Sequence, residues 1–131
     1  MFINQKKRLR KRIIENFGQI PSFISNFESI KAYHLEASKY EKHRLIDDIT
    51  WHDLEMDEVY KRINNTSTSV GEEYLYHVLH QCPLGVDSIK RRESLIEWLE
   101  QHPDERVDIQ VILEGCGKED YNNFSHYLFH S

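Results

Sequence analysis

The sequence has few of the residues that cross-link or stiffen a chain, with two cysteines, three prolines and five glycines among 131 residues. Cys82 and Cys116 lack Cys-x-x-Cys spacing, and two such cysteines without a secretion signal indicate a reducing cytoplasm. No apolar run approaches the ~18–20 residues that span a bilayer, so we expect no membrane segment. A signal peptide is not expected, because no apolar stretch follows the basic N-terminus. A transit peptide stays open, because no acid precedes Glu15.

The sequence also lacks residues whose spacing argues for catalysis or metal binding. His77-x-x-His80 and His126-x-x-x-His130 have spacings that suit two zinc ligands, but no cysteine or carboxylate stands at ligand spacing nearby. We therefore interpret these histidines as solvated. The acids of residues 47–58 are explained by helix capping and the helix dipole without a metal. No serine or cysteine is spaced with a histidine as a catalytic set, so we predict no catalytic residue and no metal site.

A glycine-rich stretch near the C-terminus does not form a nucleotide site. The segment Gly115-Cys116-Gly117-Lys118 resembles the end of a phosphate-binding loop. Ile112 stands where such a loop needs its first glycine, and Glu119 stands where it needs serine or threonine. The hydroxyl that would bind magnesium is therefore missing. We predict that these glycines end a helix and that this chain holds no cofactor of its own.

Charge is distributed unevenly along the chain. Residues 1–12 carry six bases and no acid, which leaves a charge of −11 on the rest of a chain whose total is −5. So acidic a body is not a general nucleic-acid binder, and only the basic segment could attract phosphate. Two interpretations stay open for this segment: a solvated helix face, or a contact with DNA phosphate or a protein partner. Its bases are Lys6, Lys7, Arg8, Arg10, Lys11 and Arg12.

The spacing of apolar residues predicts a mostly α-helical fold, an irregular bundle of about five to six helices. Residues 107–113 alternate in a way that also fits a strand, but a lone strand would have no partner, so we predict a helix there. The expected helices cover residues 2–17, 23–41, 54–63, 70–81, from 87 or 88 to 102, and 104–114, with a further amphipathic segment from Tyr121 to Leu128.

Polar residues mark the expected beginnings of the second and third helices. Ser25 with Glu28 has the spacing of a capping box, and Ser22 is an equally good start for the helix 23–41. Asp53 is the expected N-cap of the helix 54–63. We expect the residues before it, Leu45 to Trp51, to form an extended connection.

The helix 70–81 follows six polar residues, Asn64 to Ser69, that compete with the backbone for hydrogen bonds. Ser69 and Glu72 have capping-box spacing at its start. Gly71 lies in its first turn, where glycine costs up to about 1 kcal/mol relative to alanine, which indicates that another backbone approaches closely. The face expected to be buried consists of Val70, Tyr74, Leu75, Val78 and Leu79.

Residues 47–84 carry a family resemblance. Their pattern reads D-x-x-T-x-x-(N/D)-L-E, then T-x-T-x-(M/V)-G, then L-x-x-x-L and P-(L/V). In order and spacing it resembles the opening of the core (lever) domain of MutS-type DNA mismatch-repair ATPases. The chain departs from the family at Asp53, often asparagine, at Glu73, usually basic, and by one extra residue before Pro83. The matching residues are Asp47, Thr50, Asp53, Leu54, Glu55, Thr66, Thr68, Val70, Gly71, Leu75, Leu79, Pro83 and Leu84.

The resemblance implies a mechanical role. Residues 1–45 would be an N-terminal helical arm, and 46–131 would be part of a core domain that couples DNA contact to a C-terminal P-loop ATPase. The full-length protein would bind ATP, magnesium and DNA and act as a homodimer, while this part would catalyse nothing. The family's mismatch-reading N-terminal domain is not recognisable here. Asp47, Thr50, Asp53 and Glu55 would shape one joint, and Thr66, Thr68 and Gly71 a helix junction.

A second function class stays open, a small helical adaptor that binds a protein partner through the stripe from Phe23 to Tyr40. The stripe from Tyr121 to Leu128 has no stop signal after it, so we expect the reading frame to continue past Ser131 into a G-x-x-x-x-G-K-(S/T) loop. An adaptor would carry no such loop.

Overall fold

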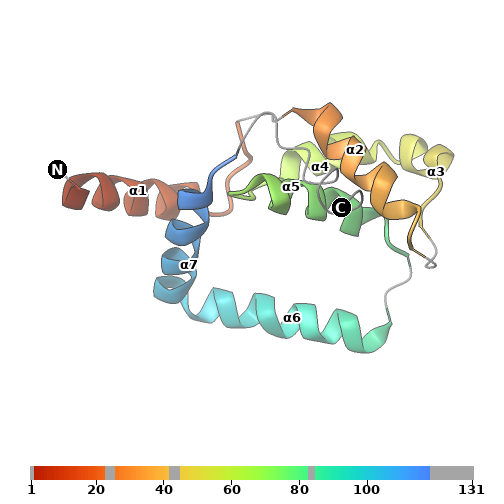
Figure 1. Cartoon of the computed structure of the whole chain (residues 1–131). Coiled ribbons are helices and arrows are strands. Elements are labelled where there is room, and N and C mark those ends of the chain that lie inside the picture. The colour runs from red at the N-terminus through yellow and green to blue at the C-terminus, as the bar shows by residue number, and fades with distance from the viewer. Residues whose placement is uncertain (1, 23–25, 42–44, 83–84, 119–131) are drawn as a thin grey trace. The chain divides into compact units, whose positions relative to one another are not determined.

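A computed structural model describes residues 2–22, 26–41, 45–82 and 85–118, and seven α-helices are found there (Figure 1). In these ranges the one β-type pairing is an isolated antiparallel bridge between Leu45 and Gln81. The predicted mostly α-helical fold is confirmed, with seven helices rather than five or six. None of the described helices is both long and apolar enough to cross a membrane. The helices are α1 Phe2–Asn16, α2 Phe27–Ser38, α3 Asp48–Asp53, α4 Met56–Ile63, α5 Ser69–His80, α6 Val86–Gln101 and α7 Pro103–Cys116.

The chain divides into two compact units. The first unit contains α1, α6 and α7, and the second contains α2 to α5. The predicted division into residues 1–45 and 46–131 rests on the family resemblance and stays a prediction.

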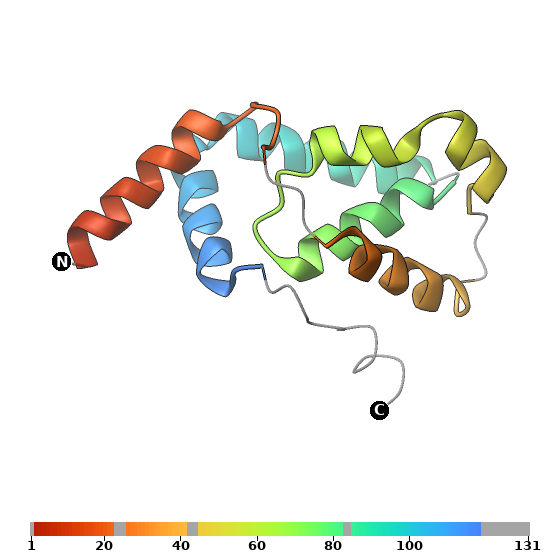
Figure 2. The same cartoon turned by 90° about the horizontal axis from the view of Figure 1, so that it is seen from above.

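In the first unit, α1 packs on α7 (Figure 2). Ile13 of α1 and Val107 of α7 are buried, and the Arg106 guanidinium lies 3.5 Å from the centre of the Phe17 ring. Pro103 is the first residue of α7, a position where its missing N–H costs nothing. The predicted helix over 104–114 is confirmed, and Gly117, with φ of +69°, follows its last residue, whereas Gly115, also predicted to end the helix, lies within α7.

Apolar spacing predicts that Ile89, Leu95, Ile96 and Leu99 form one face of α6, and this face is not buried. No residue of α6 is buried, and Ile89, Leu95 and Ile96 are exposed. Period alone predicts which residues share a helix face. It does not tell whether another element covers that face.

In the second unit, α2 packs along α5, and aromatic rings fill the space between the helices. Tyr76 is at the centre, and the Tyr60 and Trp51 rings meet it edge-on at 5.1 and 5.2 Å between centroids. Such edge-to-face pairs add about 0.5–1.5 kcal/mol each beyond the burial of their area. The buried core consists of Ile30, Trp51, Tyr60 and Tyr76, with Phe27, Ile46, Met56, Leu75 and Leu79 packed against it.

Several predicted helix ends differ from the structure. Asp47 caps α3, which includes much of the stretch expected to be extended, and its carboxylate accepts from the Thr50 N–H and Thr50 Oγ1 at 2.9 Å each. Asp53 ends α3 instead of capping α4. Asn26 caps α2, and the proposed Ser25 cap lies outside the described residues, as does the segment Tyr121–Leu128. Caps were misassigned because neighbouring polar residues offer equivalent side-chain oxygens.

Candidate functional site

The connection between α4 and α5, which we call the α4–α5 joint (residues 64–72), holds four residues of the family resemblance, Thr66, Thr68, Val70 and Gly71. Asn64 is buried and its amide donates to Glu72 Oε1 at 3.1 Å. Tyr60 Oη donates to the Glu72 carbonyl at 3.1 Å, and Lys118 Nζ lies 2.8 Å from Glu72 Oε1. Glu72 is therefore held on both its backbone and its side chain, which fixes the start of α5 against the end of α4.

Two threonines and a glycine complete the joint. Thr66 Oγ1 donates to Asn64 Oδ1 at 2.5 Å, and Thr68 Oγ1 accepts from the Gly71 N–H at 2.9 Å. Thr68 is thus the N-cap of α5, rather than Ser69. A Cβ on Gly71 would lie 3.0 Å from Thr68 Oγ1 and 3.2 Å from Thr66 Cβ. The close approach expected at Gly71 exists, but side chains make it, not another backbone.

The other residues of the resemblance lie at the α3–α4 corner, on α5, where Leu75 and Leu79 pack against the core, or outside the described ranges. Asp47 and Thr50 form the cap of α3. Asp53 and Leu54 are exposed, and Glu55 turns the chain between α3 and α4 with a left-handed φ of +50°. Pro83 is outside the described residues. The structure thus brings Thr66, Thr68 and Gly71 together but keeps Asp53 and Leu54 on the surface.

The basic N-terminal segment lies on α1, and part of it is held within the first unit. Arg10 pairs with Asp108 of α7, and Arg12 Nη2 lies 3.4 Å from Glu114 Oε2. Lys11 is 3.7 Å from Glu15 on its own helix. Lys6, Lys7 and Arg8 are exposed. Arg10 and Arg12 therefore form ion pairs between α1 and α7, whereas Lys6, Lys7 and Arg8 face solvent.

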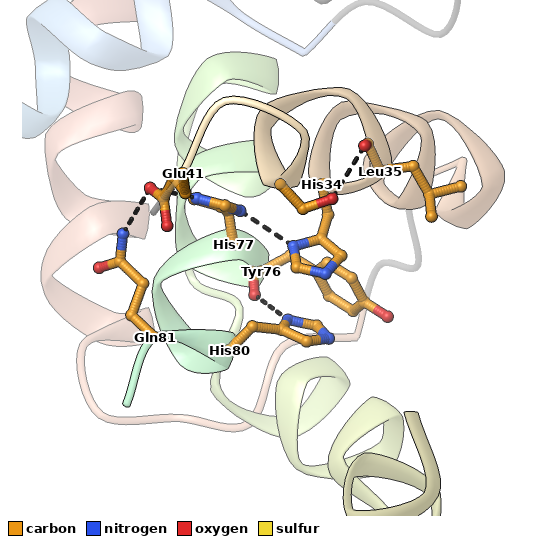
Figure 3. A network of polar contacts seen from close by, with 8 residues as sticks. His34, Leu35, Glu41, Tyr76, His77, His80 and Gln81 are labelled. Carbon is orange, nitrogen blue, oxygen red and sulfur yellow. Dashed lines mark hydrogen bonds and ion pairs between the residues drawn. The ribbon is translucent and has the colours of Figure 1, made fainter. Parts of the chain in front are cut away.

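A second polar cluster lies where α5 meets α2, and sequence reasoning missed it. We call its members His34, His77 and His80 the histidine array (Figure 3). His77 and His80 are 3% and 2% exposed, so the interpretation of this pair as solvated was wrong. The face of α5 that is buried carries Glu72, Glu73, Tyr76, His77 and His80, whereas Val70 and Tyr74 of the predicted face are exposed.

Hydrogen bonds order the array. His77 Nε2 lies 2.8 Å from Glu41 Oε1, which also accepts from Gln81 Nε2 at 3.0 Å. His77 Nδ1 lies 2.9 Å from His34 Nδ1 (Figure 3). Because a carboxylate only accepts, His77 Nε2 carries a proton, and in neutral His77 the Nδ1 lone pair then accepts from His34 Nδ1–H. A relay of hydrogen bonds thus runs from Glu41 through His77 to His34.

Ring stacking holds the third histidine. The His80 ring stacks on Trp51 with centroids 3.4 Å apart and on His34 with centroids 3.7 Å apart. His80 Nδ1 is 2.8 Å from the Tyr76 carbonyl, so this nitrogen donates. Below the stack, Asp57 accepts from Trp51 Nε1 and Tyr76 Oη at 2.8 and 2.9 Å. Stacked rings therefore connect α2, α3 and α5 at the array. The Asp57 carboxylate connects α4 to the neighbouring Trp51 and Tyr76 side chains.

Burial sets the electrostatics of the array. Desolvation, followed by repulsion from His80 and His77, lowers the pKa of His34 to about 4. Desolvation also lowers the pKa of His80, although its hydrogen bond to the Tyr76 carbonyl opposes this. Burial raises the pKa of Asp57, but hydrogen bonds from Trp51, Tyr76 and Lys31 outweigh it and bring the pKa below the ordinary range. At neutral pH His34 is therefore uncharged.

Glu73 is the most unusual acid of α5. It is 2% exposed, and its Oε2 is buried with no hydrogen-bond partner among the described residues. Burial, followed by repulsion from Glu72, raises the pKa of Glu73 to about 7. A perturbed carboxyl of this kind is a functional-site candidate only where a specific partner is also present.

The arrangement is not that of a metal centre. No group of three or more histidine, cysteine, aspartate or glutamate side chains in the described ranges is placed to hold a metal ion. Comparisons with protein-family models, with curated proteins and with solved structures found no significant match to this chain. The candidate sites consequently rest on the geometry of the α4–α5 joint and of the histidine array.

Replacing Gly71 tests the packing of the α4–α5 joint. Gly71→Leu should lower the free energy of unfolding by about 1–3 kcal/mol, because the added atoms enter space occupied by Thr66 and Thr68. Gly115→Ala is the matched control, since a Cβ there meets nothing within 4 Å, and a helix interior favours alanine by up to about 1 kcal/mol. Thermal unfolding followed by circular dichroism measures both. An unchanged midpoint for Gly71→Leu would contradict the close approach.

Replacing Glu73 tests its shifted titration. A raised pKa in the folded state contributes stability that is complete below about pH 4.5 and is lost as the pH rises through about 7. Glu73→Gln stays neutral, so its stability relative to the unchanged chain should rise between pH 5 and pH 8 by on the order of 1–3 kcal/mol. Urea unfolding at the two pH values measures this difference. Glu97→Gln, an exposed glutamate on α6, should show no comparable change.

Proposed function

We propose that this chain is the core (lever) segment of a MutS-like ATPase. It would couple DNA contact to nucleotide hydrolysis in a P-loop domain of the full-length, homodimeric, cytoplasmic protein. The observation that carries this proposal is the α4–α5 joint. Thr66, Thr68 and Gly71, which the family pattern places there, meet in one closed set of hydrogen bonds and close contacts.

The physical argument concerns how a joint transmits motion. Packed helices move as rigid bodies, and displacement passes between them only where their connection resists bending. Here the end of α4 and the start of α5 are bound to each other through Asn64, Tyr60 and Glu72. Because α2 and α5 also pack along each other, a force applied to one of these helices would be carried to the other. No step of catalysis is assigned to these residues.

The adaptor alternative is less well supported. It requires the stripe from Phe23 to Tyr40 to be open to a partner. Ile30 and Ala37 are buried at 3% and 6% exposure, and Ile30 belongs to the core that α5 completes. The middle of the stripe is therefore already covered within the second unit.

ATP hydrolysis by the full-length gene product tests the proposal. The full-length protein should hydrolyse ATP faster with DNA present, whereas the 131-residue chain should hydrolyse none. Thr66→Ala combined with Thr68→Ala should reduce the stimulation by DNA while leaving basal hydrolysis unchanged, because the joint lies outside the nucleotide site. Ser94→Ala on the exposed surface of α6 is the control. A reading frame without a P-loop would contradict the MutS-like assignment and favour the adaptor.

Any DNA affinity of the 131-residue chain should be weak and should reside in the basic segment of α1. Replacing Lys6, Lys7 and Arg8 by alanine should remove most of it, because Arg10 and Arg12 already pair with acids of α7. Binding should fall steeply with salt, since each phosphate contact releases counterions. Fluorescence anisotropy with duplex DNA at two salt concentrations measures this. Tight, mismatch-selective and salt-insensitive binding would contradict the prediction that this chain lacks the family's mismatch-reading domain.

A further inference from the structure

We propose that the histidine array is a proton-operated latch between α2 and α5, which stays closed while at most one of His34 and His77 is charged. The proposal concerns the second unit alone and does not depend on the MutS-like assignment. It starts from the pairing of two imidazole nitrogens, His34 Nδ1 and His77 Nδ1, at 2.9 Å.

A hydrogen bond between two nitrogens needs one proton and one lone pair. When both rings are neutral, His34 donates and His77 accepts. When a single proton is added to His77, its Nδ1–H donates to the His34 lone pair, and Glu41 at 2.8 Å from His77 Nε2 balances the charge. With both rings charged, two N–H groups would point at each other, so the contact between α2 and α5 would be lost.

Stacking of His34 on His80 makes a charge on His34 still more costly when His77 is already charged. The His34 ring lies against His80 at 3.7 Å, so a charged His34 would stand between two imidazoles. A charged His80 would be partly favoured by the Trp51 face at 3.4 Å, which attracts a cation. His34 stacks on His80 and meets the Tyr76 ring edge-on at 5.7 Å between centroids, and it is the ring on which the latch depends.

The charged groups around the array come from every element packed on it. Glu41 follows α2, Asp48 belongs to α3, Asp57 to α4 and Glu73 to α5, while Lys31 on α2 is a base that pairs with Asp57. Asp57 is engaged by Lys31 at 3.2 Å and by two ring donors. Glu41 is engaged by His77 and Gln81. Glu41 partly offsets the repulsion that His80 and His77 exert on a charged His34, but desolvation and that repulsion together outweigh it and lower the pKa of His34.

The direction of the pH dependence follows from burial. The pKa of His34 is lowered to about 4 from an ordinary value near 6.5. The unfolded or opened state therefore binds a proton that the closed state excludes, and the latch weakens as the pH falls from 6.5 towards 4. Above pH 6.5 the stabilisation by the neutral ring is complete. Since the array joins α2 to α5, acid should release α2 before the whole unit unfolds.

Nuclear magnetic resonance of the 131-residue chain tests the latch without any substitution. At pH 7.5 the side-chain nitrogen shifts should show His34 and His80 protonated on Nδ1 and His77 protonated on Nε2. Between pH 7 and pH 5, the hydrogen-exchange protection of the α2 amides should fall by roughly tenfold, as expected for uptake of one proton on opening. The opposite tautomer on His34, or His34 and His77 both charged with α2 still protected, would overturn the proposal.

A matched pair of variants separates the latch from general acid sensitivity. His34→Phe keeps a ring against His80 but cannot take a proton, so between pH 7 and pH 5 its α2 protection should fall about threefold less than that of the unchanged chain, with the lowered pKa of His80 accounting for the residual loss. His52→Gln removes an exposed histidine from α3 and should lose protection as the unchanged chain does. Each variant is compared with itself at the two pH values, so a uniform loss of stability does not affect the result. Equal losses in all three proteins would overturn the proposal.

Discussion

The second unit depends on the packing of a largely polar helix face against aromatic rings. The buried face of α5 consists of two glutamates, a tyrosine and two histidines, where an ordinary core helix would bury leucine or valine. Burying such groups is costly unless each finds a partner. The partners come from all neighbouring elements: Glu41 after α2, His34 on α2, Trp51 on α3, and Asn64 after α4. These partners place α2, α3 and α4 around α5.

The helices themselves could be predicted because apolar spacing and turn residues act locally. The helix over 104–114 was predicted although its period also fitted a strand, because a lone strand would have had no partner in a helical chain. The buried face of α5 could not be predicted, because an apolar stripe at Val70 and Tyr74 competed with the polar stripe of Glu73, Tyr76 and His77. What decided between them was the set of partners on α2, α3 and α4, which no local pattern contains. The spacing of Glu73, Tyr76, His77 and His80 at three and four residues was the signal available.

The two candidate sites differ in how far the sequence reveals them. At the α4–α5 joint the local patterns predicted the close approach at Gly71 but placed the cap of α5 on Ser69 instead of Thr68, and Thr66 and Thr68 were named only by the family resemblance. The histidine array required His34 and His77 to meet across 43 residues of chain, so their contact is a product of tertiary packing. Asp47 shows that local patterns also have a limit. It caps α3, a helix of six residues that is too short to produce a recognisable apolar period in the sequence.

His34 and Glu73 give the second unit a form of internal pH compensation. Protonation of His34 in the unfolded state removes stability as the pH falls below about 6.5, while the raised pKa of Glu73 adds stability over the same fall towards 4.5. Between those pH values the effects of His34 and Glu73 on the free energy of unfolding have opposite signs. The lowered pKa of His80 acts in the same direction as that of His34. In a mildly acidic medium the histidines and Glu73 would therefore act on the stability of the unit in opposite directions. The contact between α2 and α5 can therefore change with pH while the second unit as a whole stays folded.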